Sequence, residues 1–347
     1  MPPQYFYPDQ LGLIGSALVE ATGDVRWRSL KAELIPGGKS NLTFLLSSPA
    51  GEVILRRPPL GELLPKAHDM QREARIQRAL ASTSVPVPVV LFEDAGELIG
   101  APFYVMEKVP GHLIRSELPP GYAQTESARV AIANALVDTL VTLHDIDPSA
   151  VGLDDYGHPV GFLERQIGRW RRQWELSKTH EVPAVDELGA QLAKRVPPTQ
   201  KHSIVHGDYR LDNCVMDFED PSRINAVLDW ELSTLGDPLS DLGMFIFYWR
   251  EPGEDDLLLT PTVTTMPGFP GRSYLIQRYA DRSGANLDAI YFYEAFAHYK
   301  FSVIAQGIAF RVSTGAMAGQ DFGNVEGEVV RIAEEGLAKL KGLDGGG

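Results

Sequence analysis

The chain has 347 residues, of which 44% are hydrophobic and 22% are charged, as in an ordinary water-soluble globular protein. This length exceeds what one compact core usually serves, so it predicts one large two-lobed unit or two domains. The formal net charge of −14 argues against nucleic acid or an anionic membrane as a partner.

Compartment and membrane signals agree with a cytoplasmic protein. The single cysteine, Cys214, rules out an intramolecular disulfide and fits a reducing compartment. No run of about 18 apolar residues exists, so we expect no membrane-spanning helix. The start of the sequence, MPPQYFYPDQ, lacks a basic region followed by an apolar core, so we expect no secretory signal.

Apolar runs separated by turn residues predict a strand-rich first part of the chain. Residues 27–59 contain two such runs around Pro36-Gly37-Gly38 and a third run, EVILRR, after Pro49-Ala50-Gly51. Residues 85–111 add two strand candidates, and residues 68–80 have helical spacing. We therefore expect the first ~110 residues to form an antiparallel sheet of about five strands with one helix.

The pattern becomes mainly helical after Pro110-Gly111. Two short strand candidates, residues 213–220 and 224–230, form a predicted hairpin within this part. Residues 251–271 read as a long loop, of a length that is usually either a functional lid or disordered. Helical patterns cover residues 127–147, 161–177, 237–249, 271–284, 288–315 and 324–342. The sequence therefore predicts an α+β protein whose second part is largely helical.

One short motif, SIVHGDYRLDNCVMD at residues 203–217, carries the chemistry. His206, Asp208 and Asn213 match the spacing of the kinase catalytic loop H-R-D-x-x-x-x-N, with Gly207 in place of the arginine. Transfer of a phosphoryl group to a hydroxyl needs a carboxylate close to the acceptor proton, and oxygen ligands for Mg²⁺. Asp229 ends an apolar strand sixteen residues after Asn213, where a second metal-binding aspartate is expected. We therefore expect Asp208, Asn213 and Asp229 to converge at one site.

The motifs VHGDYRLDN and AVLDWELSTLGDPLSDLG resemble those of the aminoglycoside phosphotransferase family, whose fold is that of the protein kinases. The resemblance is closest to a branch of stand-alone bacterial proteins and of domains fused to acyl-CoA dehydrogenases, and it covers roughly residues 27–320. It implies a protein-kinase-like bilobal α+β fold. The implied lobes are a small antiparallel-sheet lobe at 1–109, with a hinge at 107–109, and a larger helical lobe at 110–347.

The resemblance also assigns roles to residues of the catalytic motifs. Asp208 would be the catalytic base, or the group that orients the acceptor hydroxyl. Asn213 and Asp229 would hold Mg²⁺, and His206 would brace the loop through hydrogen bonds.

Further residues would bind ATP, with GTP as an alternative. Arg56 stands where kinases have a phosphate-clamping lysine, and Glu73 stands where a helix presents a glutamate to that cation. Arg57 points to the opposite face of the strand, so the choice between the two arginines stays open, with Arg56 preferred. Backbone groups of Met106, Glu107 and Val109 would pair with adenine, and Gly38 and Ser40 would lie in the turn over the phosphates.

We expect the acceptor to be a small molecule with a hydroxyl group, and the protein to be a monomer or homodimer. A hydroxyacyl-CoA or another metabolite ranks ahead of an aminoglycoside, because the closest resemblance is to domains fused with acyl-CoA dehydrogenases. An aminoglycoside is a polycation and needs several carboxylates. The segment REPGEDD, residues 250–256, and Glu231 are candidates for such carboxylates, although an acidic loop is usually just solvated. The apolar and aromatic stretch 289–310 of one predicted helix suits an acyl pocket and core packing equally well. A pseudokinase that serves as a nucleotide-binding or scaffolding module is the alternative, favoured by Arg56 in the lysine place.

Other polar residues near the motif have structural interpretations. Asp237, before Pro238, suits a helix N-cap, and Asp241 suits an anchor of the catalytic loop. His144 lies on the apolar stripe of its helix and Cys214 within a strand, so we expect both to be buried. For Asp212, capping or solvation is as good an expectation as a metal role.

Overall fold

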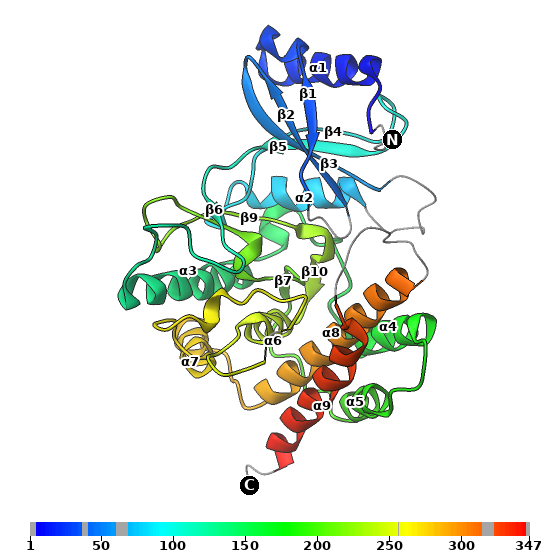
Figure 1. The fold of residues 1–347 in the computed structure, drawn as a ribbon, viewed down its shortest axis with the longest axis vertical. Helices are drawn as coiled ribbons and strands as arrows, with labels where there is room; N and C mark the ends of the chain where they lie inside the picture. The colour runs from blue at the N-terminus through cyan, green and yellow to red at the C-terminus, as the bar shows by residue number, and fades with distance from the viewer. Residues whose placement is uncertain (1–4, 37–40, 60–68, 256, 314–322, 345–347) are drawn as a thin grey trace. The chain divides into compact units, whose positions relative to one another are not determined.

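The computed structural model describes residues 5–36, 41–59, 69–255, 257–313 and 323–344 (Figure 1). The chain forms two compact units, of which unit 1 comprises Met1–Gly111 and Asn225–Ser233 and unit 2 comprises His112–Ile224 and Thr234–Gly347. The sequence analysis placed the division after Val109 and assigned residues 225–233 to the second lobe. In the structure this short segment belongs to unit 1, which brings Asp229 into the same unit as Arg56.

Unit 1 is built on a five-stranded antiparallel sheet in the order β1-β2-β3-β5-β4. The prediction of an antiparallel sheet in this part of the chain is confirmed. The register shifts once, between Val90 and Phe92, where β4 pairs with β5. The strands are β1 (Lys31–Leu34), β2 (Leu42–Ser48), β3 (Gly51–Arg57), β4 (Val90–Asp94) and β5 (Phe103–Glu107).

Helices α1 (Pro8–Thr22) and α2 (Met70–Leu80) cover opposite faces of this sheet (Figure 1). Ile14 and Leu18 of α1 belong to a core cluster with side chains of β2, β3 and β5, whereas Met70 of α2 packs with the alternate side chains of β3 and β5. The sequence analysis did not predict α1. Its signals were a proline in the first turn and a glycine, Gly23, in the left-handed conformation at its end.

Unit 2 is mainly helical, as expected, and it also contains short strands. Strand β6 (His112–Leu113) pairs antiparallel with β8 (Cys214–Met216), and β7 (Ser203–Val205) pairs antiparallel with β10 (Thr234–Gly236). Strand β9 (Ile224–Val227) begins at the boundary with unit 1. The helices are α3 (Glu126–Asp145), α4 (Phe162–Ser177), α5 (Pro183–Lys194), α6 (Leu239–Tyr248), α7 (Arg272–Ser283), α8 (Ile290–Ser313) and α9 (Val325–Asp344).

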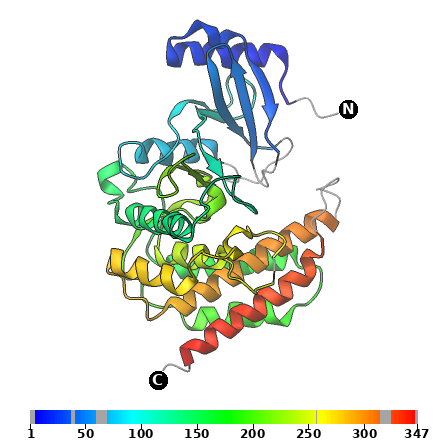
Figure 2. The same ribbon diagram turned by 60° about the vertical axis from the view of Figure 1, so that its left-hand side comes forward.

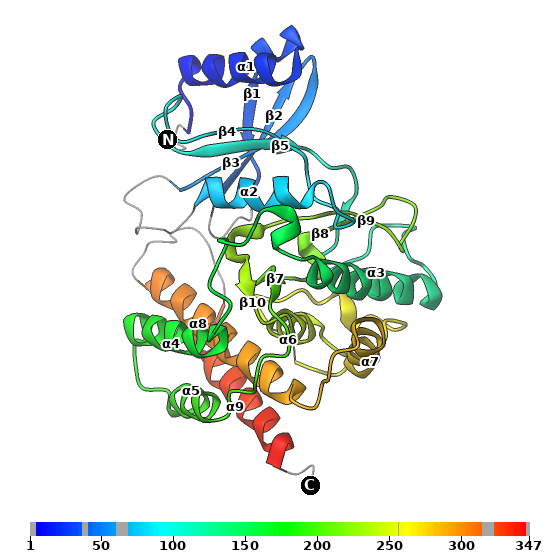
Figure 3. The ribbon, with the colours of Figure 1, turned by 180° about the vertical axis from the view of Figure 1, so that it is seen from behind.

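Helix α8 is the central helix of unit 2. It packs against α9, α6 and α4, and α5 lies beside α9 (Figures 2 and 3). Most of its side chains are buried, so core packing accounts for its apolar sequence. Gly243 allows α6 to approach α8 closely, since a Cβ atom there would lie 2.4 Å from the carbonyl oxygen of Tyr293. Among the described residues, no helix is long and apolar enough to cross a membrane.

Candidate functional site

The loop that follows β7 in unit 2 is held by Asp241, near the start of α6. The Asp241 carboxylate accepts hydrogen bonds from the backbone amides of His206 and Gly207, the latter at 2.8 Å. His144 lies 3.3 Å from the same carboxylate. Burial acts to raise the pKa of Asp241, but the interactions with His144 and His206 outweigh it and lower the pKa. Asp241 thus anchors the loop as an ion, and the buried His144 belongs to this network.

The carboxylate of Asp208 is surrounded by hydrogen-bond donors. Tyr248 donates its hydroxyl to Oδ1 at 2.7 Å, and Asn213 donates from Nδ2 to Oδ2 at 3.2 Å. The same Asn213 amide group also donates to the backbone carbonyl of Asp208 at 2.9 Å. Nε of Arg210 lies 3.4 Å from Oδ2. Because Asn213 uses its NH₂ group in these contacts, its Oδ1 is the atom that can serve a cation.

Lys300 supports the same loop from helix α8. Its ammonium group donates to the backbone carbonyl of Gly207 and lies 5.7 Å from the ring centroid of Trp170. The side chain is buried, and this burial lowers its pKa. The sequence analysis named neither Lys300 nor Tyr248 as a site residue. The available signal for Lys300 was a charged residue within an otherwise apolar stretch of helix.

Asp212 and Cys214 are both buried, Asp212 in the segment between β7 and β8 and Cys214 at the start of β8. Asp212 lies 3.2 Å from Nε of Arg210, and its burial raises its pKa. Of the alternatives considered for Asp212, this burial argues against solvation, and the metal role stays a prediction. The free thiol of Cys214 is fully buried, as expected, and burial raises its pKa. Asp237 accepts a hydrogen bond from the Leu239 amide at 3.0 Å, but the N-cap residue of α6 is Pro238, so the prediction of Asp237 as the N-cap is wrong by one residue.

A second polar cluster lies within unit 1 and is held by ion pairs. Nε of Arg56 lies 3.1 Å from Oε2 of Glu73, and Nη2 of Arg56 lies 2.9 Å from Oδ1 of Asp229. Glu73 also accepts hydrogen bonds from Tyr104 at 3.0 Å and from Asn41 at 2.7 Å. Arg56 therefore links the carboxylate of Glu73, in α2, to the carboxylate of Asp229, which follows β9.

The charges in this cluster depend on one another. Burial acts to lower the pKa of Arg56, but Glu73 and Asp229 outweigh it and raise the pKa well above its usual value. Burial raises the pKa of Glu73, with Arg56 acting in the opposite direction. Asp229 has a φ of 66°, in the left-handed region that non-glycine residues rarely adopt, and this strained backbone is typical of functional segments.

Strand alternation separates the two adjacent arginines of β3. Arg57 donates to the backbone carbonyl of Tyr5 at 3.3 Å and lies 5.7 Å from the ring centroid of Phe6. Its burial, without a carboxylate partner among the described residues, lowers its pKa. Arg56, not Arg57, is therefore the arginine that meets Glu73.

The predicted adenine-binding segment lies at the end of β5. Met106 and Glu107 pair with β3 opposite Ile54 and Val53, and Val109 follows the strand. The Glu107 amide donates to the Val89 carbonyl at 2.9 Å, so that amide is already used. Gly38 and Ser40, predicted to lie over the phosphates, fall outside the described residues.

The structure thus brings the predicted residues together in two groups. Asp208 and Asn213 meet in unit 2, whereas Asp229 meets Arg56 and Glu73 in unit 1. Convergence of Asp208, Asn213 and Asp229 stays a prediction. The amide oxygen of Asn213 and the carboxylate of Asp229 are hard oxygen donors that fit Mg²⁺, which commonly takes one or two protein ligands together with phosphate oxygens. The described residues contain no separate cluster of three or more His, Cys, Asp or Glu side chains suited to a metal.

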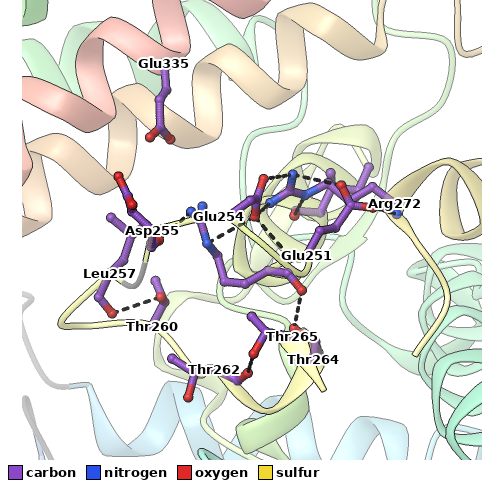
Figure 4. Close-up of polar contacts among 12 residues, drawn as sticks. Glu251, Glu254, Asp255, Leu257, Thr260, Thr262, Thr264, Thr265, Arg272 and Glu335 are labelled. Atoms are coloured by element: carbon purple, nitrogen blue, oxygen red, sulfur yellow. Dashed lines mark hydrogen bonds and ion pairs between the residues drawn. The ribbon is translucent and has the colours of Figure 1, made fainter. Parts of the chain in front are cut away.

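The described carboxylates of the acidic segment after α6 are paired with arginines, and Asp256 of this segment lies outside the described residues (Figure 4). Both Glu251 and Glu254 contact the guanidinium of Arg272, with a distance of 2.6 Å between Arg272 Nη2 and Glu254 Oε2. Arg250 lies 3.3 Å from Glu254, and Asp255 is 3.2 Å from Arg331. These carboxylates therefore hold the loop to unit 2 rather than forming a surplus of negative charge.

Comparison with proteins of known sequence agrees with this arrangement. The model of a family described as the phosphotransferase enzyme family matches residues 31–260. Acyl-CoA dehydrogenase family member 11 of Rattus norvegicus is 38% identical over 305 residues, covering 86% of this chain and 39% of the rat protein. A probable acyl-CoA dehydrogenase of Arabidopsis thaliana, IBR3, is 32% identical over 331 residues, again covering 39% of that protein. The chain thus spans about two fifths of the length of these relatives.

Solved structures give the same result for the fold. A Ralstonia eutropha protein assigned to the aminoglycoside phosphotransferases has a TM-score of 0.80 and 32% identity, covering 95% of this chain and 97% of that protein. Choline kinase of Cryptosporidium parvum has a TM-score of 0.64 at 13% identity, covering 94% and 95%. A ternary complex of the aminoglycoside phosphotransferase APH(4)-Ia with ADP and hygromycin B has a TM-score of 0.61 at 16% identity. The fold is therefore that of the aminoglycoside phosphotransferases, and the chain belongs to the phosphotransferase enzyme family.

Proposed function

We propose that this protein is an ATP-dependent O-phosphotransferase that transfers the γ-phosphoryl group to the hydroxyl of a small molecule. The observation that carries this proposal is the Asp208 carboxylate, held by Tyr248 and Asn213 on a loop anchored by Asp241. Family membership supports a phosphotransferase, and the ADP complex of a protein with the same fold supports a nucleotide as the donor.

Asp208 acts on the acceptor hydroxyl in this proposal. The acceptor oxygen forms a bond to the γ-phosphorus, and the bond from that phosphorus to the β,γ-bridging oxygen breaks, so ADP leaves. The hydroxyl proton passes to the Asp208 carboxylate and from there to solvent. Since the transition state of such transfers is loose, the main contribution of Asp208 is to orient the hydroxyl.

The remaining predicted residues hold the nucleotide. Arg56, braced by Glu73, contacts the phosphates, and the carbonyl of Glu107 and the amide of Val109 pair with adenine next to Met106. For Gly38 and Ser40, which lie outside the described residues, the role over the phosphates stays a prediction from the sequence. Asn213 and Asp229 would supply oxygen ligands to Mg²⁺, and the ion would neutralise phosphate charge when bound.

For the acceptor, we propose a hydroxyacyl-CoA or another hydroxylated metabolite ahead of an aminoglycoside. An aminoglycoside is a polycation and needs carboxylates that are not neutralised by the protein itself. Glu251, Glu254 and Asp255 are each paired with arginines, and Glu231 accepts a hydrogen bond from Asn41 at 3.1 Å. The relatives named as acyl-CoA dehydrogenases support an acyl acceptor, although the chain spans only 39% of them.

A paired assay tests this proposal. ATP turnover is measured with kanamycin and with a 4-hydroxyacyl-CoA, each against Asp208→Ala as the control. We expect saturable, Asp208-dependent phosphorylation of the acyl substrate. Efficient kanamycin phosphorylation, together with raised drug tolerance of expressing cells, would reverse the order of acceptors.

The second candidate function is a nucleotide-binding scaffold without transfer. The observation that favours it is Arg56, which stands in the lysine place and is paired with both Glu73 and Asp229. A broad panel of hydroxyl compounds and a cell-extract metabolite pool distinguish the two candidates. If neither gives turnover above the Asp208→Ala control while Mg·ATP still binds, the scaffold is the better description.

A further inference from the structure

The hydroxyl group of Tyr248 is directed at the residue proposed to orient the acceptor. It donates to Oδ1 of Asp208 at 2.7 Å, from the last turn of α6. We propose that Tyr248 is a positioning residue that fixes the Asp208 carboxylate so that it orients an alcohol in preference to water. This inference rests on the proposed phosphotransferase function and adds a determinant of acceptor selectivity to it.

The ring of Tyr248 is held firmly by its neighbours. The guanidinium carbon of Arg210 lies 5.0 Å from the ring centroid, and Phe301 meets the ring edge-on at 5.7 Å. The side chain is buried, with 6% of its surface exposed. Burial raises the pKa of Tyr248 well above its usual value, so the phenol remains a donor at neutral pH. Packing therefore fixes where this hydroxyl points.

Two donors together fix the rotation of the carboxylate. Tyr248 donates to Oδ1 and Asn213 donates to Oδ2, so a partial rotation of the carboxylate about its Cβ–Cγ bond would weaken both hydrogen bonds. A carboxylate offers about four acceptor sites on its two oxygens. Among the described residues, these hydrogen bonds use one site on each oxygen, which leaves lone pairs of fixed direction for an incoming hydroxyl.

An alcohol and water respond differently to this fixed direction. A bound acceptor has one hydroxyl in one place, so the lone pair must point at it, and a misplacement of about 1 Å can cost about a hundredfold in rate. Water is free to reorient toward whichever lone pair is available. Loss of the phenol should therefore slow transfer to an alcohol much more than it slows ATP hydrolysis.

The test is Tyr248→Phe, which removes only the hydroxyl and keeps the ring that packs on Arg210 and Phe301. Transfer to a 4-hydroxyacyl-CoA and hydrolysis of Mg·ATP alone are measured in parallel. We expect transfer to fall about 10–100-fold, hydrolysis to change less than about threefold, and the Kd for Mg·ATP to stay within about twofold. The matched control is Tyr293→Phe, because Tyr293 is another buried tyrosine whose hydroxyl donates to a buried aspartate, Asp237, at 2.9 Å.

The outcomes separate this inference from the proposed function. An equal fall in both rates, or no change in either, would overturn the positioning role while leaving phosphotransfer in place. Similar losses in the Tyr293→Phe control would show a general effect on unit 2 and would also overturn it. Absence of Mg·ATP binding to the wild-type protein would instead remove the proposed function, and the inference with it.

Discussion

The two polar clusters of this protein are stabilised in different ways. In unit 1, the guanidinium of Arg56 forms ion pairs with the carboxylates of Glu73 and Asp229, so opposite charges stabilise one another. In unit 2, the carboxylate of Asp208 accepts hydrogen bonds from two neutral donors, the phenol of Tyr248 and the amide of Asn213, while Nε of Arg210 lies farther away, 3.4 Å from Oδ2. An ion-paired cluster suits a highly charged nucleotide, whereas a carboxylate held by neutral groups keeps its charge for the acceptor. We therefore expect variants in unit 1 to impair binding and stability, and variants in unit 2 to impair turnover.

The largest effect is expected for Asp208→Ala. Phosphoryl transfer should fall about 10³-fold, because the acceptor hydroxyl loses the group that orients it and accepts its proton. The Kd for Mg·ATP should stay within about twofold, since Asp208 is not a main phosphate ligand in this account. Steady-state kinetics and calorimetry measure the two quantities. A loss of nucleotide binding equal to the loss of rate would remove the distinction between the clusters.

Next in size is the effect of Arg56→Ala on stability. Removing one partner of a buried ion pair leaves uncompensated carboxylates, so the free energy of unfolding should fall by about 3 kcal/mol. The neighbouring Arg57→Ala is the matched control, and it should cost about 1 kcal/mol through lost contact with Phe6. Urea unfolding of both variants measures the difference. Equal losses would show that the pairing of Arg56 with Glu73 and Asp229 adds no stability.

A smaller effect is expected for Asp241→Asn, which weakens the anchor of the catalytic loop. The free energy of unfolding should fall by about 2 kcal/mol at pH 7, because a neutral asparagine side chain replaces the charged carboxylate that accepts hydrogen bonds from the backbone N–H groups of His206 and Gly207. The pKa of Asp241 is lowered from 3.8 in the folded state, so this contribution is full above pH 3.8 and is lost as the pH falls through the folded value. Urea unfolding at several pH values should show the two proteins becoming more alike only below about pH 3.8. A difference that disappears already between pH 7 and 5 would contradict this origin.

The smallest effect is expected at Cys214, next to Asn213. Its thiol is fully buried and its pKa is raised, so a thiol reagent at neutral pH should not label the folded protein. The same reagent should label Cys214 completely when the protein is unfolded in denaturant. Mass spectrometry of both samples measures this, and rapid labelling of the folded chain would show that the loop around Asn213 opens readily.

Much of the fold could be predicted because its signals are local. Apolar alternation marked the strands of unit 1, and helical spacing marked most helices of unit 2. Helix α1 was not predicted, although a proline in its first turn and Gly23 at its end are boundary signals for a helix. The placement of residues 225–233 in unit 1 was also missed, because it depends on contacts between segments far apart in the sequence, such as Arg56 with Asp229.

Within unit 2, the candidate site was predicted only where its residues share a motif. Asp208 and Asn213 are five positions apart on one loop, so their spacing alone indicated a shared role. Tyr248 lies forty residues after Asp208 and Lys300 ninety-three residues after Gly207, so no local pattern connects them. Strand alternation left the choice between Arg56 and Arg57 open, and the position of Glu73 in the folded unit identifies Arg56 as its partner.

The most direct test of the central claim is a calorimetric titration of ATP, with and without Mg²⁺, into the wild-type protein, Asp208→Ala and Asp229→Ala. We predict Mg²⁺-dependent binding to the wild-type protein and to Asp208→Ala with similar Kd, and binding to Asp229→Ala that is weaker by about tenfold or more. Absence of binding to the wild-type protein at millimolar nucleotide would contradict the account, as would a Kd for Asp229→Ala equal to that of the wild type.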